Sequence, residues 1–342
     1  MTLWTALRSA RRSRWRLVAD WVLAAAGIGV AVWQLAPTLA TTDGLGARLA
    51  SLRWEWLGMG VVSGTASLIA YGELQRLLLV AGGHRLRSTT VEAVNFVANA
   101  FAQTVPSAGA TAGAVYTVAA LRRRGVDTGL SLWATTVAAT LSAAVLLAAA
   151  PFVLAFDGLL GWWPAAGLAC FLTLLLGAAA WLVGRPASLA WVSRRIGSVL
   201  RCLPIVRHRA WAVAGARAAG RIFARIARLR PRAREYAGFA AVAALSWLLD
   251  LWSLGCCGLA VAESVPWPAL AVGYLAVQAS IGLQLTPNGA GPAETALLAA
   301  LTTGGLAAPA AAIAVLLYRC ASWLLPAAAG WLTFLVIAHH DR

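Results

Sequence analysis

Long apolar runs separated by short arginine clusters are the feature that most constrains the fold of this chain. Of its 342 residues, 61% are hydrophobic and only 12% are charged, whereas a soluble domain is about half apolar and about a quarter charged. Six runs approach or exceed the ~20 residues that span a bilayer: 17–36, 54–80, 130–156, 160–184, 236–260 and 309–338. The pattern predicts an all-α polytopic membrane protein.

Two further apolar stretches, 91–120 and 268–304, are each interrupted near the middle by Pro and Gly. The first break contains Pro106 and Gly109, and the second is the segment 286–292. Pro and Gly interrupt helices, so each stretch is expected to form two shorter helices rather than one spanning helix.

Arginine placement orients these segments, because cytoplasmic loops carry an excess of basic residues. The N-terminal cluster at 8–16 is therefore assigned to the cytoplasm. The clusters at 85–87 and 122–124 fall on that same side, so the stretch 91–120 between them is expected to be a re-entrant hairpin. The basic segment 185–234 and both chain termini are also expected to be cytoplasmic. The alternative is eight plain kinked helices, which would place 122–124 outside.

The two halves of the chain repeat the same order of elements. Residues 1–156 hold three crossings and the hairpin 91–120, and residues 157–342 hold three crossings and a hairpin at 268–304. Three crossings reverse the orientation, so the predicted fold has about six spanning helices plus two oppositely oriented re-entrant hairpins in an inverted repeat. Broken helices of this kind meet near the midplane, where protein or a water-filled cavity must cover them.

Bulk charge and motif content exclude several classes of function. The net charge is +16 and every basic residue is Arg, a usage that indicates a GC-rich bacterial genome. These Arg lie between apolar runs, so they indicate membrane orientation rather than nucleic-acid binding. The five Cys form no CxxC pair and no His lies near them, so no metal or cofactor is expected. No P-loop, nucleophile elbow or HExxH motif is present, and no enzyme activity is expected.

Charged residues inside apolar runs are costly and therefore candidates for function. Asp250 lies mid-helix with no obvious partner and is a candidate for proton coupling. Arg319 lies near the midplane of the last helix, and Glu294 lies just past the second break, so the two could pair. That pair is either a structural lock or part of a substrate site, and both interpretations stay open. Glu73 has a local partner in Arg76, which favours a structural role.

Two other sets of groups could face a cavity. Half-helices that start at the midplane offer unpaired N–H groups and a positive dipole end, which suit an anion such as a lipid phosphate. Gly289 and Gly291 would permit close backbone approach there. Polar side chains that could line a cavity are Tyr71, Gln75, Asn95, Asn99, Gln103, Gln278 and Gln284.

The second break and the helix after it resemble the transmembrane region of the lysylphosphatidylglycerol synthases and related flippase-like integral membrane proteins. That family has a Pro-Gly-Gly-x-Gly-x-x-Glu tip and a Tyr-Arg pair on the next helix. The matching residues are Pro287, Gly289, Gly291, Glu294, Tyr318 and Arg319. Asn288 stands where the family usually has Gly. The region from Pro106 to Gly113 resembles the first-half motif, without the Glu and Arg often found after that Pro.

The resemblance implies a protein that binds and translocates a lipid across the cytoplasmic membrane, such as an aminoacylated phospholipid or a polyprenyl-linked sugar. The implied substrate-binding residues are Pro106, Gly109, Pro287, Asn288, Gly289, Gly291, Glu294, Tyr318 and Arg319. The expected partners are an anionic membrane lipid, a separate lipid-modifying enzyme and a second copy of the chain. The soluble aminoacyl-transferase activity of the synthases is not expected, because the membrane region occupies these 342 residues.

Two rival functions follow from the same sequence. One is a transporter of a small hydrophilic solute, which would work without a lipid substrate. The other is a non-transporting anchor that holds a separate enzyme through the segment 185–234.

Overall fold

The computed structural model describes residues 51–105, 109–184, 229, 231–283, 287–289 and 291–340, and within these ranges every regular element is a helix. The predicted span at 17–36, nearly all of the basic segment 185–234, and Pro106 and Gln284 lie outside the described residues. An all-helical fold is therefore confirmed for the part of the chain that is described.

The helices form two compact units, each assembled from separate stretches of sequence. The described residues of the first unit are 51–69, 92–105, 109–116, 246–283, 287–289 and 291–340, and the second unit includes Ala70–Val91 and parts of Thr117–Leu245. The helices that contribute residues to both are α3 (Trp54–Ala81), α4 (Ser88–Thr104), α5 (Gly109–Arg123) and α10 (Ala233–Leu259). The division into repeats at residue 156 stays a prediction.

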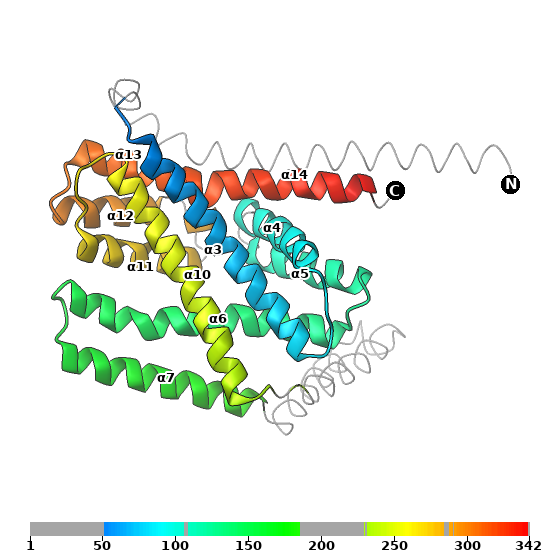
Figure 1. Ribbon diagram of the computed structural model, residues 1–342. Coiled ribbons are helices and arrows are strands. Elements are labelled where there is room, and N and C mark those ends of the chain that lie inside the picture. The colour runs from blue at the N-terminus through cyan, green and yellow to red at the C-terminus, as the bar shows by residue number, and fades with distance from the viewer. Residues whose placement is uncertain are drawn as a thin grey trace, which may run out of the picture. The chain divides into compact units, whose positions relative to one another are not determined.

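The second unit contains the helical pair α6 (Thr128–Phe156) and α7 (Trp162–Gly184), which run side by side (Figure 1). Asp127 caps α6, because its carboxylate accepts from the N–H groups of Gly129 and Leu130. The core of this unit is aliphatic with two aromatic side chains, and its buried members include Leu74, Leu78, Val91, Leu121, Leu130, Trp133 and Phe239.

The first unit contains the C-terminal helices in chain order. They are α11 (Trp267–Leu283), the short turn η1 (Pro287–Gly289), α12 (Pro292–Thr303), α13 (Ala308–Arg319), the π-helical turn η2 (Cys320–Leu324) and α14 (Leu325–His340). The π turn ends two residues before Pro326, which has no N–H to bond to the carbonyl four residues earlier. The backbone thus changes its hydrogen-bond pattern immediately after Arg319.

Both apolar stretches are broken where Pro and Gly predicted. The first divides into α4 and α5, and the second into α11 and α12, which pack against each other (Figure 1). These four helices have 12 to 17 residues. At 1.5 Å per residue they are about 18–26 Å long, shorter than the ~30 Å core of a bilayer. The paired short helices are confirmed, while their re-entrant position in a membrane stays a prediction.

Close packing of α5 on α4 depends on glycine. A Cβ atom on Gly113 would lie 2.5 Å from the carbonyl oxygen of Ala98, which is too close for any side chain. Gly109 likewise faces the carbonyl of Ala102. The two helices therefore fold back on one another with their backbones in contact.

Three described helices are long and apolar enough to cross a membrane: Thr128–Phe156, Arg234–Leu259 and Ala308–Ile337. They match three of the predicted spans. The predicted span 54–80 forms the helix α3 but is not among the three, and it carries Glu73 and Arg76. The predicted span 160–184 forms the 23-residue helix α7, and its stretch Trp162–Gly177 is apolar.

Serine and glycine hold α3 against α10 inside the first unit. Ser63 Oγ donates to the carbonyl of Leu249 at 2.7 Å, and Ser253 Oγ donates to that of Gly60 at 2.7 Å. A Cβ atom on Gly64 would lie 3.1 Å from Ser253 Oγ. Hydrogen bonds between small residues are a common means of helix association in membranes, and here they fix the helix that carries Asp250.

Candidate functional site

A cavity of about 260 Å³ lies within the first unit, between parts of both broken helix pairs and of α10, α13 and η2. Its polar lining side chains are Asn99, Gln103, Asp250, Gln278, Asn288, Tyr318, Arg319 and Ser322. Ligand sites are typically concave, with a few convergent polar groups in an apolar wall, and Ile281, Val105 and Trp247 supply apolar wall here.

Asp250 is the centre of a hydrogen-bond network within this unit. Its Oδ2 accepts from Tyr274 Oη at 2.9 Å, from Tyr318 Oη at 3.2 Å and from Gln278 Nε2 at 3.3 Å. The prediction that Asp250 has no partner is therefore wrong. Three neutral donors from α11 and α13 hold the carboxylate, and their hydrogen bonds replace those to water that the carboxylate loses on burial.

Tyr274 is the member of this network that sequence reasoning missed. Its signal was its spacing, since it lies four residues before Gln278 and therefore on the same face of a helix. The aromatic pair Trp247 and Tyr274, with ring centroids 6.3 Å apart, also joins α10 to α11 beside Asp250.

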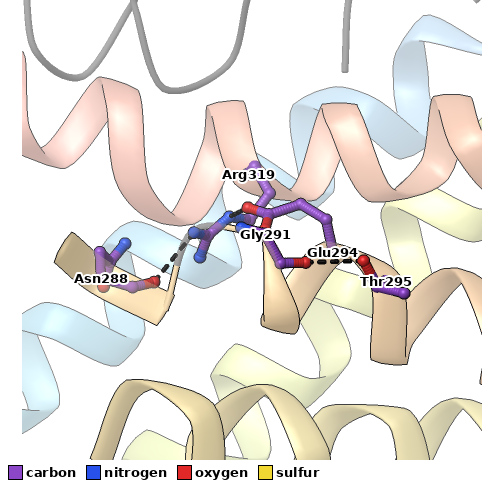
Figure 2. A network of polar contacts seen from close by, with 5 residues as sticks. All are labelled: Asn288, Gly291, Glu294, Thr295 and Arg319. Atoms are coloured by element: carbon purple, nitrogen blue, oxygen red, sulfur yellow. Dashed lines mark hydrogen bonds and ion pairs between the residues drawn. The ribbon is translucent and has the colours of Figure 1, made fainter. Parts of the chain in front are cut away.

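Arg319 is bound to the second break by two contacts (Figure 2). Its Nε lies 2.6 Å from Glu294 Oε1, and its Nη2 donates to the carbonyl of Asn288 at 3.0 Å. The arginine side chain is 2% exposed and that of Glu294 is 13% exposed. The guanidinium also lies over the ring of Trp323, at 4.6 Å from its centroid. The predicted pairing of Glu294 with Arg319 is confirmed.

Glu294 also caps the helix that it begins. Its Oε2 accepts from the N–H of Gly291 at 2.6 Å, and Thr295 Oγ1 donates to the carbonyl of Gly291 at 2.8 Å (Figure 2). Pro292 occupies the first turn, as expected for a helix start. With one oxygen on Arg319 and the other on the backbone, Glu294 has the contacts of a structural lock.

Left-handed backbone shapes the tip itself. Asn288, Gly289 and Gly291 have φ values of 49°, 68° and 91°. Asn tolerates this region better than most residues with a Cβ, which explains how Asn288 stands where the family pattern usually has Gly. In this conformation the Asn288 carbonyl accepts the hydrogen bond from Arg319.

The opposite wall of the cavity includes an amide pair on α4. Gln103 Nε2 donates to Asn99 Oδ1 at 2.9 Å. Within the described part of the chain, Asn99 Nδ2 and Gln103 Oε1 are buried and have no hydrogen-bond partner.

The structure brings together some of the predicted site residues. The cavity lining includes Gly109, Asp250, Asn288, Tyr318 and Arg319. Four other predicted site residues lie at the second tip but do not line the cavity: Pro287, Gly289, Gly291 and Glu294. Pro106 lies outside the described residues.

The remaining polar candidates have separate roles. Asn95 Nδ2 donates to the carbonyl of Leu68 at 2.8 Å, a contact between α4 and α3 within the first unit. Tyr71 and Gln75 belong to the second unit. So does the Glu73–Arg76 pair, in which Arg76 donates to both carboxylate oxygens at 2.5 and 2.6 Å. The structural assignment of that pair agrees with its geometry.

The charges at the cavity and its tip are two carboxylates, Asp250 and Glu294, and one guanidinium, Arg319. Glu294 forms an ion pair with Arg319, whereas the hydrogen bonds to Asp250 come from neutral side chains. Within the described ranges, no three His, Cys, Asp or Glu side chains converge as metal ligands would. The Asp250 carboxylate can accept hydrogen bonds, and the neutral donors that bond to it can be exchanged for others.

Comparison with protein families identifies a relationship for this chain. The family described as "Lysylphosphatidylglycerol synthase TM region" matches residues 3–330, and this agrees with the motif resemblance at the second break. No curated protein matches the chain.

Proposed function

This chain belongs to the family of the lysylphosphatidylglycerol synthase transmembrane region, and from that premise we propose that it binds a membrane lipid and translocates it across the cytoplasmic membrane. Family membership shows a membrane protein related to lipid modification. Translocation, rather than chemistry on the lipid, is the proposed activity, and no enzyme reaction is assigned to it.

The observation that carries the proposal is the polar cavity itself. Two broken helix pairs, far apart in sequence, contribute side chains to one cavity inside the first unit. Interrupted helices with a polar site between them are how many transporters build a substrate site at mid-membrane depth. The cavity is the proposed head-group site, with the lipid tail outside it.

Two charged groups receive different roles in this proposal. The Arg319–Glu294 pair holds the second tip in position beside the cavity. Asp250, whose hydrogen bonds come from neutral donors, is the proposed proton-coupling group, since protonating it would remove its negative charge. Intramembrane carboxylates are frequent members of proton relays in transporters.

The proposed topology has six spanning helices and two opposed re-entrant hairpins, with both termini cytoplasmic in the cell membrane. Arginine placement supports it, as does the short length of the four broken helices. Single cysteines at Arg123 and Asn288, in a background without native cysteines, test it. Labelling of Arg123→Cys by an impermeant maleimide from the cytoplasm alone is expected, whereas labelling from outside would refute the first hairpin.

Lipid movement is tested directly with the full chain in liposomes. The probe is phosphatidylglycerol with a fluorescent acyl chain, and the readout is its exposure to an impermeant quencher under an imposed pH gradient. We expect faster exposure than in protein-free liposomes. Asp250→Asn should slow it about 10-fold, the equivalent of about 1.4 kcal/mol, while Glu73→Gln in the second unit should not. Equal rates with and without protein would reject translocation.

A second candidate is a non-transporting anchor for a separate lipid-modifying enzyme, which the family's relation to lipid modification favours. This candidate depends on the basic segment 185–234, whereas the transporter depends on the cavity. Deleting that segment should abolish the cellular phenotype of an anchor and leave lipid movement in liposomes intact. An anionic lipid, a partner enzyme and self-association are the proposed partners.

A further inference from the structure

The amide pair on α4 is the part of the cavity wall that the transport proposal does not use. Asn99 and Gln103 lie one helical turn apart, and the hydrogen bond between them uses one donor and one acceptor of the two amides. What remains is one donor, Asn99 Nδ2, and one acceptor, Gln103 Oε1. Both are buried and have no partner in the described residues.

Buried polar atoms in native proteins nearly always have a hydrogen-bond partner. Since both residues line the cavity, a molecule in the cavity is the natural source of one. That molecule must present an acceptor to Asn99 and a donor to Gln103, side by side.

This requirement separates the chemical groups found on lipids. An ammonium group has donors and no lone pair, so it would leave Asn99 Nδ2 unsatisfied. An ionised phosphodiester has acceptors only, so it would leave Gln103 Oε1 unsatisfied. A hydroxyl group both donates and accepts, and it satisfies the pair without adding charge.

The charges around the cavity lead to the same group. An ionised Asp250 repels an anion in the cavity, and Arg319 is already engaged by Glu294 and the Asn288 carbonyl (Figure 2). A neutral hydroxyl can instead donate to a carboxylate, a charge-assisted bond that is stronger than a neutral one.

The size of the cavity limits the ligand further. At about 260 Å³ it lies below the ≈ 300–1,000 Å³ of sites for drug-sized ligands. It can hold a glycerol or a single sugar, and the rest of the lipid must lie outside.

We propose that the Asn99–Gln103 pair is a specificity element that binds the hydroxyls of an uncharged glycerol or sugar unit in the lipid head group. This inference rests on the proposed function, because it names the chemistry that the same cavity selects. A phosphate on that lipid would stay outside the amide-lined wall.

The test measures protection of the cavity by lipids of defined head group. The full chain, with its native cysteines replaced and Ser322→Cys as the cavity reporter, is placed in phosphatidylcholine nanodiscs. Four lipids with identical acyl chains are added in turn: glucosyldiacylglycerol, phosphatidylglycerol, phosphatidylethanolamine and phosphatidic acid. The rate of maleimide labelling is the readout. A second reporter, Glu263→Cys, exposed between α10 and α11, controls for general effects of the lipid.

We expect the two hydroxyl-bearing lipids to slow labelling of the cavity reporter most, because phosphatidylethanolamine and phosphatidic acid can offer both a donor and an acceptor only by bringing a charged group into the cavity. Whichever of the two hydroxyl-bearing lipids protects the reporter more strongly shows whether the hydroxyls come from a sugar or from a glycerol. In the variant Asn99→Leu/Gln103→Met, half-protection should need about 30-fold more lipid, since each lost hydrogen bond contributes a factor of roughly five. Asn99→Asp, which retains the shape but turns the spare donor into an acceptor, should shift protection toward phosphatidylethanolamine.

Best protection by phosphatidylethanolamine or phosphatidic acid in the unmodified pair would overturn the inference, although lipid binding would stand. Absence of protection by all four lipids, with phosphatidylglycerol still translocated in liposomes, would also overturn it, and water would then fill the site. If neither protection nor translocation occurs, the proposed function fails as well.

Discussion

Replacing Glu294 by Gln tests the structural lock at the second tip. The change keeps an oxygen to accept from the N–H of Gly291, so the cap of α12 is retained. What is lost is the negative charge 2.6 Å from Arg319 Nε. The guanidinium, only 2% exposed, would then be buried without a counter-charge, which costs about 3–5 kcal/mol. Loss of a favourable charge at the helix N-terminus adds about 0.3–1 kcal/mol.

The matched control is the other carboxylate–arginine pair, Glu73 with Arg76. Its side chains are 32% and 29% exposed, so Glu73→Gln should cost only about 0–1 kcal/mol. The assay is the free energy of unfolding by SDS titration in mixed micelles. A double-mutant cycle with Arg319→Met measures the interaction free energy between Glu294 and Arg319, because the double variant buries no unpaired charge.

The double variant Glu294→Gln/Arg319→Met should be more stable than the sum of the two single losses by at least about 2 kcal/mol. If Glu294→Gln costs no more than Glu73→Gln and the cycle shows no coupling, the two groups do not lock the tip. The contacts in Figure 2 would then have to serve the substrate instead.

Three further predictions use the same unfolding measurement. Gly291→Ala should cost about 1–3 kcal/mol because φ is 91° there, while Gly282→Ala, with no atom within 4 Å of its Cβ, should cost nothing; equal losses would contradict the strain. Gly113→Ala should cost about 1–3 kcal/mol by pushing α5 off α4, with Gly58→Ala in open space as its control. Ser253→Ala should cost about 0.6 kcal/mol, the mean for an interhelical hydrogen bond in a membrane; a loss above about 2 kcal/mol would contradict this.

The sequence predicts the breaks and the Glu294–Arg319 pair because local rules govern both. Pro and Gly end helices wherever they stand. The pair follows from depth, since a residue ten positions into a helix lies about 15 Å along it. Pro292 and the Glu two residues later then mark a capped helix start.

The partners of Asp250 could not be predicted in the same way. They lie on α11 and α13, 24 to 68 residues along the chain, and only the packing of three helices brings them together. In an apolar run, Tyr274 has the same appearance as a tyrosine of the core. Nor does the sequence separate the amides that bond within the protein, such as Asn95, from those at the cavity wall, such as Asn99.

The charge arrangement bears on where an anionic head group could bind. In a low-dielectric interior, a cation attracts an anion only when its charge is not already compensated. Arg319 is compensated by Glu294, so releasing it to a phosphate would break that ion pair and its contact with the Asn288 carbonyl. An ionised Asp250 among its neutral donors raises the free energy of any anion beside it. The cavity therefore favours the uncharged part of a head group, and a phosphate is expected at the membrane side of the tip, away from Asp250.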